Sequence, residues 1–264
     1  MRNWTLLPAL FIGLQLSAQD AEWTSIKDIN PFIGTGGHGH THPSAQAPFG
    51  MIQLGPNTRY DGWDGCSGYH YTDSAMYGFT CTHLSGTGVS DYGDLLMLPY
   101  SSPTKEGDHI KFFKEDEHAQ AGYYACILED GTRIEATASD RAGILRIRFG
   151  EGGEPGIMID LNFRDRVLKK SFEATGIGEW QGSRISEGWA REQHFYFGLE
   201  ITARPDTAIE VSDGVYWIPM PEGTRETTVR MGMSGTSEQG AWMNTIAELT
   251  NKNFEEVFAE TQEK

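Results

Sequence analysis

The sequence has few positive charges. Its 264 residues include 21 Lys and Arg against 37 Asp and Glu, so the formal net charge is −16 at pH 7. Proteins that bind nucleic acids need a basic surface to neutralise phosphate groups, and anionic membrane surfaces attract the same kind of surface. The charge balance therefore excludes nucleic acid as a partner and argues against binding to an anionic membrane.

Cysteine is also scarce, with only Cys66, Cys81 and Cys126 in the chain. An odd number cannot pair completely within one chain, and no Cys-x-x-Cys or Cys/His spacing typical of a zinc finger is present. At most one disulfide can form, and Cys66 and Cys81 are close enough in sequence to bridge a hairpin. Three small buried apolar side chains are an equally good interpretation.

No hydrophobic run reaches the roughly 20 residues that a membrane-spanning helix needs. The first apolar run, residues 4–16, contains Pro8, follows Arg2 and is followed closely by Ala18. A positive start, an apolar centre and a small final residue predict a signal peptide over residues 1–18, and a membrane anchor is the disfavoured alternative. We therefore expect an exported protein, periplasmic or secreted, with no membrane insertion.

From the middle of the chain onward, apolar residues alternate with polar ones, which is typical of strands with one buried face. The alternating apolar sets are Leu145, Ile147 and Phe149; Phe195, Phe197, Leu199 and Ile201; and Val229, Met231 and Met233. Turn signals such as Asp213-Gly214 separate them. No amphipathic helices lie between these predicted strands, which excludes a parallel α/β fold. We predict an all-β chain with an antiparallel β-sandwich over residues 19–236.

Residues 237–264 change to helical spacing. The apolar residues that recur at this helical spacing are Ile246, Leu249, Phe254, Val257 and Phe258. Asn253, followed three residues later by Glu256, is a capping-box pattern that predicts a helix start. The last helix reaches Lys264 without a Gly or Pro terminator, so we expect a helical linker toward a further domain, which would cover the apolar stripe.

A glycine- and histidine-rich segment, residues 34–43, contains His38, His40 and His42. In an extended conformation the three imidazoles would project on one face and could bind a metal ion or anionic oxygens. A metallohydrolase that uses these residues is therefore one candidate function. The favoured interpretation is a polar loop whose imidazoles form hydrogen bonds with a ligand or with the backbone.

Two further segments place aromatic rings beside short polar side chains. Residues 57–71 include Trp63 and Asp64, and flat aromatic faces next to carboxylates and amides are typical of sugar-binding sites. A core tryptophan beside a turn aspartate is the alternative interpretation. Residues 82–94 include His83 and several Ser and Asp residues, but they lack the Gly-x-Ser-x-Gly pattern of a serine hydrolase.

Several motifs, in this order and spacing, resemble the N-terminal domain of glycoside hydrolase family 92. They are INPFIGTGGHGHT at 29–41, PFGMIQL at 48–54, CSGYHY at 66–71 and THLSGTG at 82–88, closing on YGD at 92–94. The resemblance covers residues 29–264. It implies an exported, calcium-dependent, exo-acting α-mannosidase that inverts the anomeric centre. Such a protein is built from a β-sandwich, a helical linker and a C-terminal (α/α)6 barrel.

The resemblance also implies where the functional groups lie. The catalytic acid, the catalytic base and the calcium-binding carboxylates belong to the barrel, so no catalytic residue and no metal ligand is assigned in this chain, which we expect to be inactive alone. The sandwich loops would close one side of a pocket for mannose-containing glycans, with His38, Trp63, Asp64 and His83 against the substrate. Calcium is expected only in the complete enzyme, because it prefers six to eight oxygen ligands and histidines suit it poorly. A free-standing carbohydrate-binding module stays open as an alternative.

Overall fold

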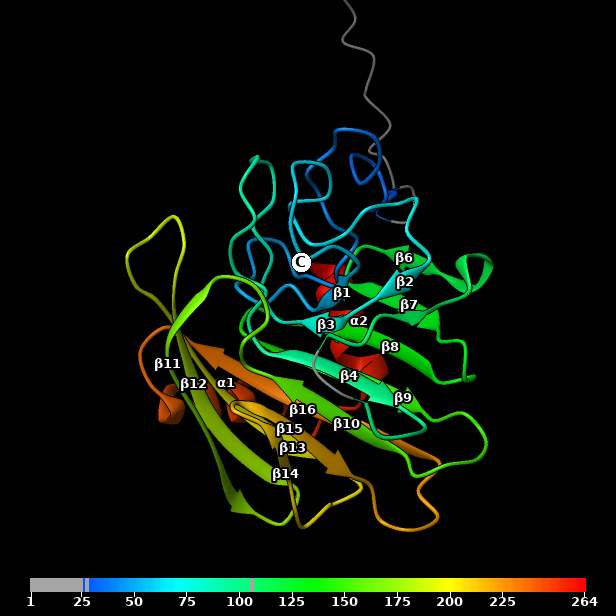
Figure 1. Cartoon of the computed structure of the whole chain (residues 1–264), viewed down its shortest axis with the longest axis vertical. Coiled ribbons are helices and arrows are strands. Elements are labelled where there is room, and N and C mark those ends of the chain that lie inside the picture. The colour runs from blue at the N-terminus through cyan, green and yellow to red at the C-terminus, as the bar shows by residue number, and fades with distance from the viewer. Residues whose placement is uncertain (1–25, 27–28, 105–106) are drawn as a thin grey trace, which may run out of the picture.

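Two antiparallel β-sheets face each other in the computed structural model, which describes residue 26, residues 29–104 and residues 107–264 (Figure 1). The predicted signal peptide, residues 1–18, lies outside the described residues. The first sheet contains, in spatial order, β1 (Gly55–Asn57), β3 (Gly78–Thr80), β4 (Leu96–Tyr100), β10 (Gly156–Asp160), β15 (Val215–Pro219) and β14 (Ile209–Ser212).

The second sheet is larger and has eight strands. Its spatial order is β11 (Arg166–Gly176), β12 (Glu179–Glu187), β13 (Gln193–Ile201), β16 (Glu226–Ser234), β9 (Ala142–Arg148), β8 (Arg133–Ala138), β7 (Tyr123–Ile127) and β6 (His118–Gln120). A short two-stranded sheet pairs β2 (Ala75–Met76) with β5 (Ile110–Lys111), and the 3-10 helix η2 (Lys114–Asp116) precedes β6.

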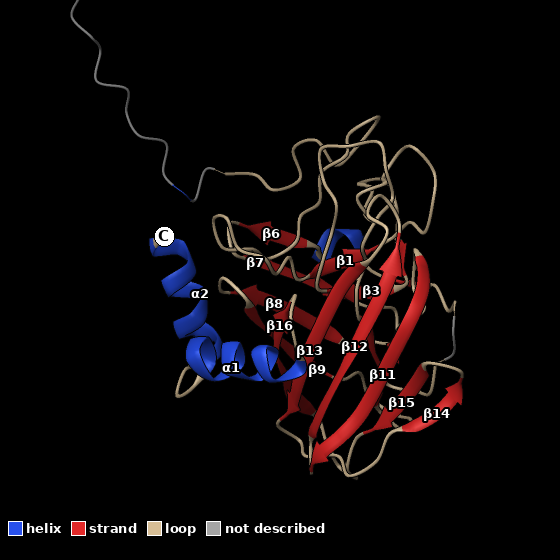
Figure 2. Ribbon diagram, turned by 90° about the vertical axis from the view of Figure 1, so that its left-hand side faces the viewer, coloured by secondary structure: helices blue, strands red, loops and turns tan. Residues whose placement is uncertain are grey.

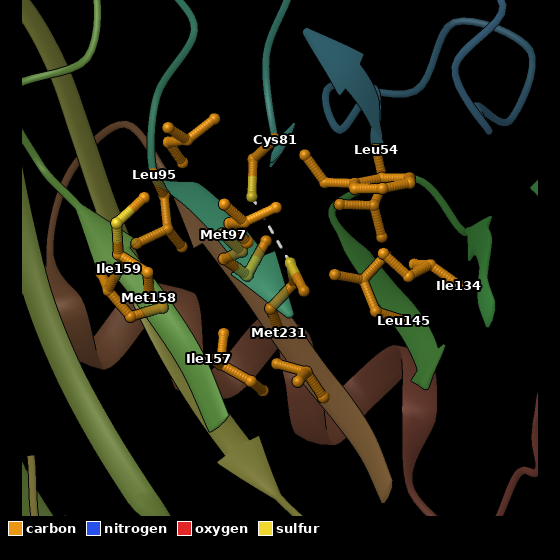
Figure 3. Packing of buried hydrophobic residues seen from close by; sticks show 14 of the residues in the cluster. Leu54, Cys81, Leu95, Met97, Ile134, Leu145, Ile157, Met158, Ile159 and Met231 are labelled. Carbon is orange, nitrogen blue, oxygen red and sulfur yellow. Dashed lines mark hydrogen bonds between the residues drawn. The ribbon is translucent and has the colours of Figure 1, made fainter. Parts of the chain in front are cut away.

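The hydrophobic core lies between the two large sheets. Met97 of β4, Ile157 of β10 and Met231 of β16 are each at most 1% exposed within it (Figure 3). Successive side chains of a strand point to opposite faces. Leu145 of β9 therefore joins this core, whereas its neighbour Ile144 packs on the other face of the sheet. The predicted antiparallel β-sandwich is confirmed.

Two C-terminal helices, α1 (Glu238–Leu249) and α2 (Phe254–Glu263), pack on the outer face of the eight-stranded sheet (Figure 2). The predicted capping box is present, because the Asn253 side chain accepts a hydrogen bond from Glu256 N and the Glu256 side chain accepts one from Asn253 N. Neither helix, nor any other among the described residues, is long and apolar enough to cross a bilayer.

The structure corrects our expectation for the apolar stripe of these helices. Leu249 and Val257 are at most 1% exposed, because they pack with Phe254 against Ile144 on the outer face of β9. Ile246 is different, since 54% of it is exposed. Most of the stripe is therefore covered within this chain and does not require a further domain to bury it.

All three cysteines are buried and none forms a disulfide. Cys81 Sγ lies 3.4 Å from Met231 Sδ inside the core (Figure 3), and Cys66 Sγ donates a hydrogen bond to the Thr87 carbonyl oxygen. Burial raises the pKa of the Cys66 thiol above its usual value. The interpretation of small buried side chains is confirmed, and a Cys66–Cys81 bridge is not formed.

Three long loops project from one end of the sandwich (Figure 1). We call them together the crown: the first crown loop spans residues 34–43, the second 58–71 and the third 82–94. Because they lie at the same end of the sheets, the histidine-rich, aromatic and His83-containing segments come together although they are separate in sequence. The crown therefore positions every candidate site residue predicted above.

Candidate functional site

Backbone hydrogen bonds tie the three crown loops to one another. Tyr71 N donates to Thr35 O at 2.9 Å, which joins the second loop to the first. Gly86 N donates to His40 O at 2.7 Å, which joins the third loop to the first. The His70 side chain adds another link, because its Nε2 donates to the Gly37 carbonyl oxygen at 3.0 Å. The crown is thus one connected structure and not three independent loops.

His38 and Asp64 form an exposed pair on this surface. Nδ1 of His38 donates a hydrogen bond to Oδ1 of Asp64 at 2.7 Å, and the two side chains are 87% and 38% exposed. The hydrogen bond raises the pKa of His38 above its usual value and lowers that of Asp64. An imidazole and a carboxylate held side by side at the surface can offer a donor and an acceptor to a hydroxyl-rich ligand.

Trp63 precedes this carboxylate and is 62% exposed, so it does not belong to the core. One edge of its indole packs on Gly88 of the third crown loop, where an added Cβ would lie 2.1 Å from the ring, so a larger residue there would displace the indole. The His40 ring contacts the indole edge-on, with centroids 4.8 Å apart. The indole is therefore held in place while much of its surface stays open to solvent.

His83 lies beneath this exposed surface and is 2% exposed. Its Nδ1 donates to the Ser67 carbonyl oxygen at 2.8 Å, and its ring stacks on His42 with centroids 4.6 Å apart. Burial lowers the pKa of His42 to about 4 and the pKa of His83 well below its usual value, so both imidazoles stay neutral near pH 7. The structure thus separates His83 from the three exposed candidates and places it as a support beneath them.

The three histidines of the first crown loop do not converge. His38 pairs with Asp64, His40 contacts Trp63, and His42 stacks on the buried ring. The three rings contact different partners, so the one-face arrangement that a fully extended segment would give is not formed. Within the described parts of the chain, no group of three or more His, Cys, Asp or Glu could hold a metal ion. The geometry gives no support to a metallohydrolase built on these residues.

Arg164 is a residue of the site that the sequence did not reveal. It is 1% exposed and lies under the second and third crown loops. Its guanidinium donates to the carbonyl oxygens of Tyr60 and Cys66 at 3.1 and 2.7 Å and to the Ser90 hydroxyl. Its backbone adopts a φ of 55°, an uncommon value for a non-glycine residue. A lone arginine in a connection between strands usually lies in solvent, so no sequence pattern predicted that Arg164 would be buried.

Comparison with known families decides where this chain belongs. The model of the glycosyl hydrolase family 92 N-terminal domain matches residues 29–244, which include the whole crown and every strand of the sandwich. The chain is a member of glycoside hydrolase family 92. The motifs that carried the resemblance all lie within the matched residues, and the sandwich is the family's N-terminal domain.

Individual relatives agree with this assignment. An Arthroderma benhamiae protein named as an uncharacterized secreted glycosidase is 27% identical over 96% of this chain and 39% of its own length. A family GH92 alpha-mannosidase from Bacteroides thetaiotaomicron is 28% identical with a TM-score of 0.82, over 90% of this chain and 37% of that one. A structure of the same mannosidase holds mannoimidazole.

A further solved structure extends the likeness of fold. A family GH92 inverting mannosidase from the same organism has a TM-score of 0.77 at 21% identity, which shows the fold alone. It matches 92% of this chain and 36% of its own length. The chain thus spans less than two fifths of the relatives it matches, and those relatives contain a large part that has no counterpart among its 264 residues.

Proposed function

We propose that this chain is the N-terminal, substrate-pocket-forming part of an exported, inverting α-mannosidase that acts on mannose-containing glycans. Three exposed crown residues, His38, Trp63 and Asp64, would contact the sugar, with His83 supporting them from below. The observation that carries this proposal is the open indole of Trp63 beside the His38–Asp64 pair. The family GH92 alpha-mannosidase that resembles the chain supports mannose as the sugar.

The chemistry of these three residues suits sugar binding. An indole face packs on the C–H face of a sugar ring, and the neighbouring imidazole and carboxylate can exchange hydrogen bonds with its hydroxyl groups. Asp64 is a poor general acid, because its hydrogen bond with His38 lowers the pKa of the carboxyl. We therefore assign Asp64 to binding and orientation and not to proton transfer.

Catalysis would require groups beyond this chain. Inverting hydrolysis uses two carboxyl groups roughly 6.5 to 9.5 Å apart, with a water between one of them and the sugar. Calcium needs six to eight oxygen ligands, and no set of acidic or histidine side chains within the described residues could hold a metal ion. The residues present do not fit calcium, and we propose that it binds elsewhere in the complete enzyme.

Export is part of the same proposal. Residues 1–18 carry the positive start, apolar centre and small final residue of a signal peptide. The Arthroderma benhamiae relative is named as a secreted glycosidase, which supports export. Fractionation of cells that express the protein, followed by N-terminal sequencing, should find a product that begins near Gln19 outside the cytoplasm. An intact N-terminus in the cytoplasm would contradict export.

Two assays test the activity. The protein at the full length that its gene encodes should hydrolyse aryl α-mannosides and α-linked mannobiose, with the β-anomer as first product by NMR. Purified residues 19–264 should bind mannosides without turnover, because one wall of the pocket cannot supply both an acid and a base. Turnover by residues 19–264 alone, or retention of the anomeric configuration by the full-length protein, would overturn the proposal.

A further inference from the structure

A second exposed tryptophan stands near the crown. Trp189 is 77% exposed and lies in the hairpin that joins β12 to β13. This hairpin projects from the end of the sandwich that carries the crown (Figures 1 and 2), whereas the turn between β11 and β12 lies at the opposite end. Single exposed apolar side chains are common on protein surfaces, so the contacts around Trp189, and not its exposure alone, decide whether it has a role.

The backbone that carries this indole is fastened to the third crown loop. The Asp91 carboxylate accepts hydrogen bonds from Trp189 N and from Gln193 Nε2, and Asp91 itself is 4% exposed. Gly188 packs directly on the same carboxylate, since an added Cβ would lie 2.8 Å from its oxygens. A buried carboxylate thus fixes the hairpin at the position of Trp189. The backbone that carries the indole is therefore anchored, and the indole does not stand on a free loop.

A cavity of about 350 Å³ has one wall formed by the hairpin residues Ala190, Glu192 and Gln193, which follow Trp189 directly in the chain. Its apolar lining includes Met51, Phe195 and Met233, and its polar lining includes Gln53, Tyr92, Glu192 and His194. The volume lies within the range of small-ligand sites, and the mixture of apolar surface with hydroxyl, amide, carboxylate and imidazole groups matches the two faces of a sugar ring.

The two exposed tryptophans are attached to one short segment of the third crown loop. Gly88 supports the Trp63 indole, and Asp91 holds the Trp189 backbone. Three residues of backbone span at most about 10 Å, so these two attachment points are close together. The Trp63 indole and the Trp189 backbone are therefore anchored close together on the same part of the crown, as contacts with nearby units of a single glycan require.

We propose that Trp189 and the cavity beside it form a second sugar subsite, which takes a further hexose unit of the glycan whose terminal unit contacts Trp63. The protein would then recognise an oligosaccharide and not only its terminal sugar. Trp189 would supply stacking area, and Gln53, Glu192 and His194 would supply hydrogen bonds. This inference rests on the proposed function, because it assumes that the glycan is bound at the crown.

Substrate length provides the test. In the full-length protein, Trp189→Ala should raise KM for an α-linked mannotetraose about 5-fold or more, with kcat changed little. KM for an aryl mannoside, which has no further sugar unit, should change less than about 2-fold. Trp189→Phe should recover part of the loss, because a smaller aromatic ring still stacks. Ile177→Ala is the control, because Ile177 is an exposed apolar residue, 57% exposed, at the opposite end of the sandwich, and its truncation should change KM for neither substrate.

The outcomes separate this inference from the proposed function. If the wild-type protein hydrolyses both substrates and Trp189→Ala affects them equally or not at all, the second subsite is wrong and the proposed function stands. If the wild-type protein hydrolyses neither substrate, the proposed function fails. Calorimetric titration with mannotetraose then tests whether the second subsite exists. Weaker binding by Trp189→Ala than by wild type would support it. Equal or absent binding would overturn it, as would a large fall in melting temperature, which would mean that the indole packs against protein.

Discussion

Asp94 and Arg184 form an ion pair inside the protein, with Oδ1 of Asp94 2.5 Å from Nη1 of Arg184 and side chains 4% and 0% exposed. Asp94 closes the third crown loop, and Arg184 belongs to β12 of the eight-stranded sheet. The guanidinium also donates to the carbonyl oxygens of Phe163 and Arg164 at 2.8 and 2.6 Å. One buried cation therefore joins the base of the crown to the sandwich.

Removing one charge of this pair should destabilise the whole domain. Asp94→Asn leaves the Arg184 charge buried without its partner, so we expect a loss of about 3 to 5 kcal/mol in the free energy of unfolding, measured by urea denaturation. Glu187→Gln is the control, because it breaks the exposed Glu187–Arg166 pair and should change stability by less than about 1 kcal/mol. Similar effects of the two substitutions would contradict the structural role of the buried pair.

Trp63→Ala should impair sugar binding and leave folding nearly unchanged. We expect a loss of about 1 to 3 kcal/mol of aromatic contact, seen as a roughly 5- to 150-fold lower catalytic efficiency of the full-length enzyme on mannosides. Trp180→Ala provides the contrast, because Trp180 is 2% exposed and its truncation should cost about 3 to 5 kcal/mol of stability. A Trp63→Ala protein with a strongly lowered melting temperature and normal kinetics would disprove the stacking role.

The His38–Asp64 pair should be visible in an NMR titration. The hydrogen bond to Asp64 raises the pKa of His38, so Asp64→Asn should return it toward the ordinary value of about 6.5. The stabilisation that His38 gains is present below its unfolded pKa and is lost as the pH rises through its folded pKa. Asp61→Asn, a change in the same loop, is the control and should leave the titration of His38 unaltered. An unchanged pKa in Asp64→Asn would show that the pair does not form in solution.

His42 should make the domain less stable in weak acid. Its pKa is lowered by burial to about 4, against about 6.5 in an unfolded chain, so the unfolded state binds more protons between these values. Stability is therefore lost as the pH falls through this window, by about 2 kcal/mol for His42 between pH 7 and pH 5. His42→Gln should remove this part of the pH dependence, as measured by the free energy of unfolding from urea denaturation at the two pH values. An equal loss in both proteins would show that His42 is not buried in its neutral form.

The cysteines provide a test of the core. Because all three thiols are free and buried, a thiol reagent should react slowly with native residues 19–264 and should titrate three thiols after unfolding. Burial raises the pKa of the Cys66 thiol, which further slows its reaction. A count of one thiol in the unfolded, unreduced protein would reveal a disulfide and contradict the structure.

Local sequence was enough to predict three of the strands and the last helix. In β9, β13 and β16 the alternation of apolar residues is a direct consequence of burying one face of a pleated strand, so it can be read without knowing the partner strands. The capping box of α2 depends on residues only three apart, Asn253 and Glu256, and it too was predicted. The crown motifs also gave the family, because their order and spacing are features of the sequence itself.

Long-range packing decided what the candidate residues do. His38, His40 and His42 look equivalent in sequence, yet each contacts a different residue of the second or third crown loop. The burial of His83 and the attachment of Trp189 to Asp91, 98 positions away, depend on contacts between distant segments. The sequence by itself determined the β-sandwich, the helical end and the family. Only the tertiary structure decided which tryptophans face solvent and which histidines are buried, because these side chains meet where the two sheets bring three separate loops to one end.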